Sequence, residues 1–310
     1  MPTQQMLFDK SKLPFHRKYR THQVLCRTVG QLASIILPPP QKVVIITNGR
    51  TGSNLLVSYL NSSPDVRAYG EVFGTYYLSS DFLMKRLRQP GGVVRHLREM
   101  LRRSTTEKIT AVKMLYQHFD ERFRKRQELP ELSNVLPELQ HDPEVKIIHL
   151  RRENLLDVVV SNMLAKQSGN YVGKSYNIEA ITVPPRVCRR QFMAIEEREN
   201  YFRQAFPTER YLELTYEGLT EQPEETLAKV ETFLGIENLE ARSHIQKQNR
   251  ASKIDVIANY DELHWFFRRS EYRRFFDASR PLINPRRIKK PDTPHEENRS
   301  PDGPTRKNQH

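Results

Sequence analysis

Two glycines, an arginine and a serine lie together after a run of β-branched residues. The run Val43-Val44-Ile45-Ile46-Thr47 leads into Gly49-Arg50-Thr51-Gly52-Ser53-Asn54, and apolar residues then recur at helical spacing. This pattern predicts a buried parallel strand, a tight turn and a helix with Ser53 as its N-cap. The helix N-terminus offers unpaired N–H groups, and the glycines allow close backbone approach. We therefore expect residues 49–54 to bind a phosphate or sulfate group, with added donors from Arg50 and Ser53.

The turn differs from the phosphate loop of nucleoside triphosphatases and kinases. That loop has a glycine five residues after its first glycine and then a lysine, where this chain has Asn54 and Leu55. An ordinary nucleoside triphosphatase is therefore disfavoured. Taken alone, the segment is also compatible with a plain strand–helix turn that is capped by a serine.

A second strand–helix turn carries two arginines. Residues 145–150 predict a strand, a helix is expected from about Leu155 to Lys166, and Arg151 and Arg152 lie between them. Arginine suits a phosphate dianion because its guanidinium donates two charge-assisted hydrogen bonds at once. In isolation, a pair of surface arginines beside acidic residues is an equally good interpretation.

The two segments VVIITNGRTGSNLLVSYLNSSPDVRAYGEVF and VKIIHLRRENLLDVVVSNML together resemble sulfotransferases that use 3′-phosphoadenosine-5′-phosphosulfate (PAPS). The resemblance is nearest to the bacterial carbohydrate and lipopolysaccharide-type branch, and it extends to the tyrosylprotein sulfotransferases. It implies that residues 49–54 hold the 5′-phosphosulfate and that Arg152 and Ser161 hold the 3′-phosphate. Arg151 competes with Arg152 for that role. Many eukaryotic members space this pair by eight residues rather than nine.

Two further segments resemble the family less closely, and the whole resemblance spans residues 43–265. YLELTYEGLTEQPEETLAKVETFLGI is similar to a strand, a Tyr-Glu-X-Leu turn and a helix, which we interpret as scaffold. The stretch from Lys247 to Leu263 resembles a segment that folds over the nucleotide. This similarity adds Arg250 and Lys253 to the expected PAPS contacts.

Sulfuryl transfer needs a base for the acceptor proton and a cation near the leaving phosphate, and it needs no metal in principle. The resemblance implies Glu71, in Gly-Glu-Val-Phe, as the base and Lys113, in a predicted strand over residues 109–115, as the cation. His118 is an alternative base. A solvated carboxylate, a lysine at a sheet edge and a structural histidine are the corresponding scaffold interpretations.

Strands that alternate with helices predict an α/β fold, a doubly wound parallel sheet with helices on both faces. Further elements are a strand over residues 211–215, a helix from Pro223 to Leu234, and two basic amphipathic helices within residues 81–103. We expect a lead-in over residues 1–40, a sulfotransferase domain over 41–280, and a disordered basic, proline-rich tail over 281–310.

Composition favours an anionic partner. The 310 residues carry 50 Lys and Arg against 37 Asp and Glu, a net charge of +13, and only two cysteines. No apolar stretch is long enough to span a membrane, so we expect a cytoplasmic protein. The sequence leaves the oligomeric state open.

The acceptor is the part of the reaction that the sequence determines least. We expect it to bind to loops within residues 72–108 and 167–205, which are rich in Arg and Tyr. A carbohydrate or glycolipid hydroxyl, reached at a membrane surface in the second case, is preferred over a tyrosine peptide. The alternative from another class is a non-catalytic nucleotide- or nucleic-acid-binding module, which would need neither Glu71 nor Lys113.

Overall fold

A five-stranded parallel sheet organises the chain in the computed structural model, which describes residues 30, 32–33, 35–74, 78–102, 104–169, 180–242 and 253–284. The strands are β1 (Gln41–Thr47), β2 (Val66–Glu71), β3 (Ile109–Leu115), β4 (Val145–Arg151) and β5 (Tyr211–Thr215). Their spatial order is β2-β3-β1-β4-β5, with parallel neighbours throughout. The expected doubly wound parallel sheet is confirmed.

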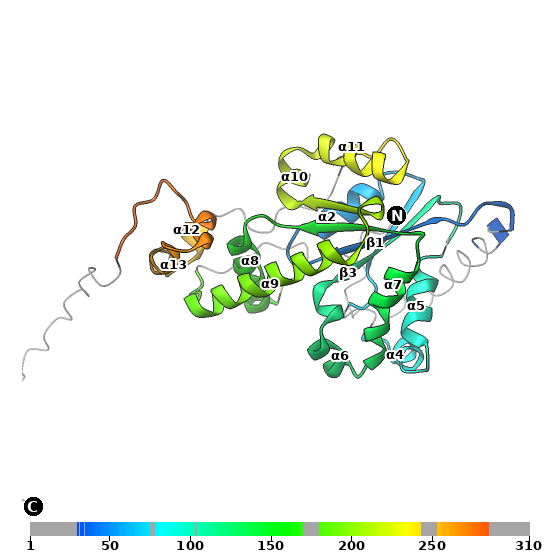
Figure 1. Cartoon of the computed structure of the whole chain (residues 1–310), viewed down its shortest axis with the longest axis horizontal. Coiled ribbons are helices and arrows are strands. Elements are labelled where there is room, and N and C mark those ends of the chain that lie inside the picture. The colour runs from blue at the N-terminus through cyan, green and yellow to red at the C-terminus, as the bar shows by residue number, and fades with distance from the viewer. Residues whose placement is uncertain are drawn as a thin grey trace, which may run out of the picture. The chain divides into compact units, whose positions relative to one another are not determined.

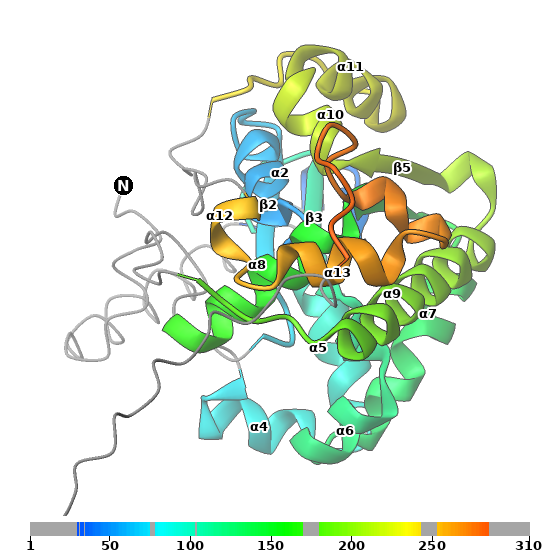
Figure 2. The same ribbon diagram turned by 90° about the vertical axis from the view of Figure 1, so that its left-hand side faces the viewer.

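Helices cover both faces of the sheet. Figure 1 shows α2 (Ser53–Leu60), α10 (Tyr216–Glu221) and α11 (Pro223–Leu234) on one side, and Figure 2 agrees for α10 and α11. Further helices are α4 (Asp81–Leu87), α5 (Gly92–Met100), η2 (Tyr116–Phe119), α6 (Glu121–Gln127), η3 (Pro130–Asn134), α7 (Val135–His141), α8 (Leu155–Ser168), α9 (Pro185–Ala205), η4 (Thr208–Arg210), α12 (Lys253–Val256), α13 (Tyr260–Phe267) and η5 (Glu271–Phe275).

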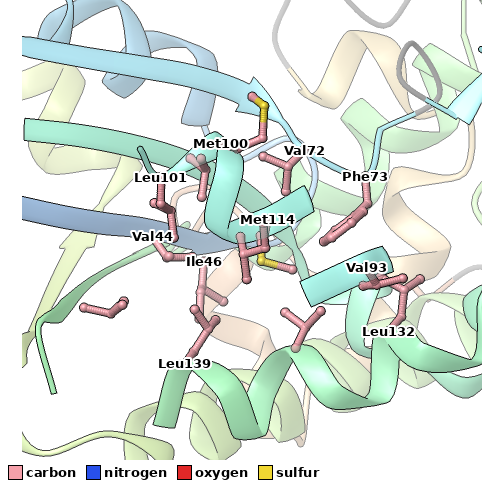
Figure 3. Packing of buried hydrophobic residues seen from close by; sticks show 14 of the residues in the cluster. Val44, Ile46, Val72, Phe73, Val93, Met100, Leu101, Met114, Leu132 and Leu139 are labelled. Carbon is pink, nitrogen blue, oxygen red and sulfur yellow. The ribbon is translucent and has the colours of Figure 1, made fainter. Parts of the chain in front are cut away.

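Strand β1 is the centre of the core because both of its faces are buried. Val43 and Ile45 pack in a cluster with apolar residues of α2 and α11. Val44 and Ile46 pack on the opposite face with residues of α5 and α7, as Figure 3 shows for Leu139 of α7. Burial on two sides explains why the strand is a continuous apolar run rather than an alternating one.

The chain leaves neighbouring strands β1 and β4 in opposite directions. From β1 it crosses β3 to reach β2, whereas from β4 it runs to β5. In open α/β sheets, ligands bind at the C-terminal ends of the strands where such a reversal occurs. The two turns that the sequence analysis selected, after β1 and after β4, lie at this position.

Two elements differ from expectation. Residues 66–71 form the edge strand β2, which the sequence analysis did not predict. Residues 185–205, placed within an acceptor loop, form the 21-residue helix α9, because Cys188, Phe192, Ile195 and Phe202 make a buried stripe at helical spacing. The two helices expected within residues 81–103 are present as α4 and α5.

The chain divides into two compact units, Met1–Asn259 and Tyr260–His310. In the second unit, the Asp277 backbone N–H donates to the Tyr260 hydroxyl at 2.8 Å, and Arg280 pairs with Asp261 at 2.8 Å. The domain limits expected from the sequence stay predictions. Within the described residues, no helix is long and apolar enough to cross a membrane.

Candidate active site

The loop between β1 and α2 is held by its own side chains. Arg50 has a left-handed backbone with φ 72°, which costs free energy in a non-glycine residue. The Thr47 hydroxyl donates to the Leu150 carbonyl at 2.6 Å, and the Thr51 hydroxyl donates to the Asn48 carbonyl at 2.9 Å. The Thr51 side chain, which was assigned to the cofactor, therefore helps to fix the shape of the loop.

The two glycines of the loop have different surroundings: Gly52 is packed against Tyr216, whereas Gly49 has no neighbouring atoms at its Cβ position among the described residues. Gly52, with φ 79°, is the N-cap of α2, so the prediction that Ser53 is the cap was wrong by one residue. A left-handed residue before a helix is most easily a glycine. A Cβ at Gly52 would lie 3.0 Å from Cε2 of Tyr216 and would overlap Cδ2, whereas a Cβ at Gly49 would meet no atom of the described residues within 4 Å.

Arg152 lies against this loop from the β4 side. Its Nη1 is 3.5 Å from the Arg50 carbonyl oxygen, and its Nη2 donates to Asp157 at 2.9 Å. Its guanidinium carbon is 4.5 Å from the centre of the Tyr216 ring. Ser161 of α8 accepts a hydrogen bond from Arg50 Nε at 3.0 Å. The structure thus brings the two predicted anion-binding turns into direct contact.

The neighbouring Arg151 points elsewhere. Its Nε donates to Glu213 of β5 at 2.8 Å. In the part of the chain that the structure describes, Arg152 Nε is buried and has no hydrogen-bond partner, although Glu217 Oε1 lies 3.9 Å away. Of the two arginines, Arg152 is therefore the one that faces the β1–α2 loop.

Lys113 and Glu71 meet on adjacent strands. They are partners between β3 and β2, after a register shift that follows Ala68, and Lys113 Nζ lies 3.3 Å from Glu71 Oε1. Lys113 Nζ also donates to Asn54 Oδ1 of α2 at 2.6 Å. Only 3% of Lys113 is exposed, and burial lowers the pKa of Lys113 while the Glu71 carboxylate opposes that shift. These partners offset the cost of burying an ammonium group.

His118 lies in the core instead of facing a ligand. It has no exposed surface, whereas a third of the Glu71 side chain is exposed. Its Nδ1 accepts from the Leu115 backbone N–H at 3.2 Å, and its ring contacts Phe73 and Phe123. Burial, with a smaller effect of the nearby Lys113 charge, lowers the pKa of His118 to about 3. In this conformation the neutral ring presents no atom to an acceptor.

Comparison with known proteins identifies the family. The model of the family described as "Sulfotransferase family" matches residues 40–241. The chain belongs to the sulfotransferase family. This sulfotransferase is 28% identical to nodulation protein H of Rhizobium tropici over 258 residues. The aligned region covers 79% of this chain and 98% of the relative. Nodulation protein H of Rhizobium meliloti (strain 1021) is 26% identical, over 78% of the chain and 97% of that protein.

Among solved structures, the sulfotransferase is similar to a sulfotransferase from Alicyclobacillus acidocaldarius. The TM-score is 0.42 and the identity is 14%, over 75% of this chain and 92% of the other. A mouse sulfotransferase complexed with 3′-phosphoadenosine-5′-phosphate (PAP) gives a TM-score of 0.41 and 13% identity, over 80% and 91% of the two chains.

Two of the expected contacts of the sulfotransferase fall outside what the structure describes. Arg250 lies in the undescribed range 243–252, and the side chain of Lys253 is likewise not described. Both positions also follow the matched range 40–241. Their assignment to the cofactor stays a prediction. In the described ranges, no group of three or more His, Cys, Asp or Glu side chains could hold a metal ion.

Tyr216 is the residue whose place in the site the sequence analysis missed. Its motif was interpreted as scaffold, yet the ring fills the space beside Gly52 and lies under the Arg152 guanidinium. The sequence signal for Tyr216 is its position directly after the predicted strand over residues 211–215, and the pairing of that strand with β4 comes from the structure. Tyr216 thereby links the helix cap of the β1–α2 loop to Arg152.

Proposed function

We propose that this sulfotransferase moves a sulfuryl group from PAPS to a hydroxyl group of its acceptor. The observation that carries the proposal is the junction of two anion-binding turns, residues 49–54 and Arg152 with Ser161, through the Arg50–Ser161 hydrogen bond. PAPS carries two anionic groups, a 5′-phosphosulfate and a 3′-phosphate. A pair of adjacent anion sites at the strand ends is what such a nucleotide requires.

The residues present fit this donor. Gly52 gives the N-terminus of α2 no side-chain cap, so the first-turn N–H groups can face an anion, and the open space at Gly49 leaves room for close approach of the 5′-phosphosulfate. Arg152 has a buried Nε without a hydrogen-bond partner among the described residues, which a 3′-phosphate oxygen would satisfy. Ser161 would add its hydroxyl on the same side.

The Glu71–Lys113 pair supplies the groups that the transfer needs. PAPS, when bound, supplies a sulfuryl group on a phosphate leaving group. In our proposal the Glu71 carboxylate takes the proton of the acceptor hydroxyl while the hydroxyl oxygen forms its new bond to sulfur. The Lys113 ammonium stabilises the electron pair that the breaking S–O bond leaves on the phosphate oxygen.

For the acceptor we propose a hydroxyl group on a carbohydrate or glycolipid, modified in the cytoplasm. The resemblance of the loop and of the Gly-Glu-X-Phe segment to the carbohydrate branch supports this choice. Glu71 also ends an edge strand with part of its side chain exposed, where a bulky acceptor has room to approach.

Calorimetry with PAP, adenosine 5′-phosphate, ATP and GTP tests the donor. PAP should bind at least about tenfold more tightly than adenosine 5′-phosphate, since only PAP engages both turns. Equal affinities for these two nucleotides would contradict the two-site proposal.

Transfer from radiolabelled PAPS to a panel of glycans, glycolipids and tyrosine peptides tests the reaction. We expect label on glycans or glycolipids. Label on peptides alone would overturn the proposed acceptor class. Tight PAP binding without transfer to any acceptor would favour the non-catalytic nucleotide-binding module.

A further inference from the structure

We propose that Asn54 is a positioning residue whose side-chain amide holds the Lys113 ammonium against the first turn of α2. This inference rests on the proposed role of Lys113 in sulfuryl transfer. Asn54 belongs to the predicted nucleotide loop and lies 59 residues away from Lys113 in the sequence. The hydrogen bond connects α2, the helix that follows the loop, to strand β3 through the Lys113 ammonium.

The geometry fixes how the amide is used. Asn54 Oδ1 accepts from Lys113 Nζ at 2.6 Å, closer than the 3.3 Å between Nζ and Glu71 Oε1. An ammonium group only donates, so the amide oxygen must face it and the NH₂ group must donate elsewhere. Asn54 is the second residue of α2, where unpaired backbone N–H groups attract anions. One side chain thus provides the acceptor that joins Lys113 to the first turn of α2.

The charges around Lys113 explain why a neutral acceptor suits this position. Glu71 of β2 stabilises the ammonium, whereas the Arg50 charge and burial both act against it. His118 of η2 is buried and neutral, so it adds no second positive charge beside the ammonium. An aspartate in place of Asn54 has the same shape and would stabilise Lys113 further, but its charge would repel an anion in the same turn. The amide stabilises the ammonium without that repulsion.

The test is a pH titration of the Lys113 side chain by NMR, with ¹³Cε-labelled lysine in the full chain and Lys113→Met for assignment. In Asn54→Ala, the midpoint should move down by roughly one pH unit, because the buried ammonium loses a charge-assisted hydrogen bond. In Asn54→Asp, it should move up by a similar amount. Ser58→Ala, one turn further along α2, is the matched control and should leave the midpoint unchanged.

Local loosening would give a different result. Solvent access would raise the midpoint toward the ordinary lysine value in both Asn54 variants, so a fall in Asn54→Ala identifies the lost acceptor. Unchanged midpoints in both variants would overturn the inference. The titration needs neither nucleotide nor acceptor, so midpoints that shift in a protein without PAP binding would uphold the inference and overturn the proposed function.

Nucleotide binding and turnover give a second readout. PAP affinity should fall at least about tenfold in Asn54→Asp, because a negative charge enters the anion-binding turn. In Asn54→Ala, kcat should fall with little change in the KM for the acceptor, and the alkaline limb of kcat should move down with the NMR midpoint. If the alkaline limb of the kcat–pH profile stays in place while the NMR midpoint of Lys113 moves, the contact does not affect catalysis and that part of the inference is wrong.

Discussion

At the scale of single residues, Glu71 and Lys113 form an ion pair at 3.3 Å with unequal burial. Lys113 is almost completely enclosed, whereas Glu71 retains an exposed side-chain surface. The enclosed cation can act on a group bound in the loop beside it. The exposed carboxylate can act on a group that arrives from solvent. The two residues should therefore respond differently to mutation.

Glu71→Gln keeps the size of the side chain and removes the proton acceptor. Turnover should fall by about 10²-fold or more, the usual effect of a positioned general base, while PAP affinity changes little. Lys113→Met should lower turnover and also weaken PAP binding, because it removes a cation next to the loop. Single-turnover transfer from radiolabelled PAPS and calorimetry measure these effects. Near-normal turnover in Glu71→Gln would remove Glu71 from the mechanism and return attention to His118.

The two glycines of the loop separate a ligand requirement from a folding requirement. Gly49→Ala adds a methyl group to open space, so the free energy of unfolding should change by less than about 0.5 kcal/mol. PAP affinity should nevertheless fall about tenfold or more, because the methyl group occupies the approach of the phosphosulfate.

Gly52→Ala should instead lower the free energy of unfolding by roughly 2 kcal/mol, from its left-handed backbone and the overlap with Tyr216. Urea unfolding and calorimetry with PAP distinguish the two variants. Normal PAP affinity in a folded Gly49→Ala protein would place the phosphosulfate elsewhere.

At the scale of elements, the turn between β4 and α8 sends consecutive arginines to different partners. Arg151 is the last residue of β4 and pairs with Glu213 of the neighbouring β5, whereas Arg152 lies beyond the strand end and reaches the β1–α2 loop. The helix that follows is capped by Asn154, whose side chain accepts from the Asp157 backbone N–H. This cap fixes the start of α8 and hence the position of Ser161.

Arg152→Ala and Arg151→Ala test this division. Arg152→Ala should reduce PAP affinity to that of adenosine 5′-phosphate, because the 3′-phosphate loses its guanidinium partner. Arg151→Ala should keep the preference for PAP and lower the free energy of unfolding by roughly 1 kcal/mol through loss of the Glu213 pair. Calorimetry and urea unfolding measure both quantities. Loss of the preference in Arg151→Ala alone would reverse the assignment.

At the scale of the whole molecule, burial sets the charge of several interior groups. Burial lowers the pKa of His118 to about 3 and also lowers the pKa of His149. Burial raises the pKa of Glu199 to about 7. The unfolded chain binds protons at these histidines below about pH 6.5, so their effect is to reduce stability as the pH falls. Glu199 acts in the opposite direction, since its stabilising protonated form is lost as the pH rises through 7.

The contribution of His118 can be isolated with His118→Gln, which keeps a neutral acceptor for the Leu115 N–H. Between pH 7 and pH 5 the wild-type protein should lose about 2 kcal/mol more unfolding free energy than the variant. Glu199 contributes equally to both proteins, so its effect cancels when the unfolding free energies of the variant and the wild type are subtracted. Urea unfolding at pH 7, 6 and 5 provides the measurement. Parallel pH dependence in the two proteins would contradict a buried neutral His118.

The sequence by itself determined the central strands and the two strand–helix turns that are predicted to bind anions. Strands β3 and β5 have the predicted bounds, and β1 and β4 extend the predicted ones slightly. The inner strands β1, β3 and β4 are rich in apolar residues because both of their faces are buried. The edge strand β2 gave no such signal, since Arg67 and Gly70 interrupt it and one side lacks a neighbour. Local composition therefore identified the three inner strands and the edge strand β5, and it missed the other edge strand, β2.

The tertiary structure decided which of these residues meet. Asn54, Glu71 and Lys113 come from α2, β2 and β3, and only the strand order β2-β3-β1 places them within hydrogen-bond distance. The choice between Arg151 and Arg152 likewise depends on β5 lying beside β4 to hold Glu213. Contacts between residues far apart in the sequence follow from strand order, which no local pattern of side chains encodes.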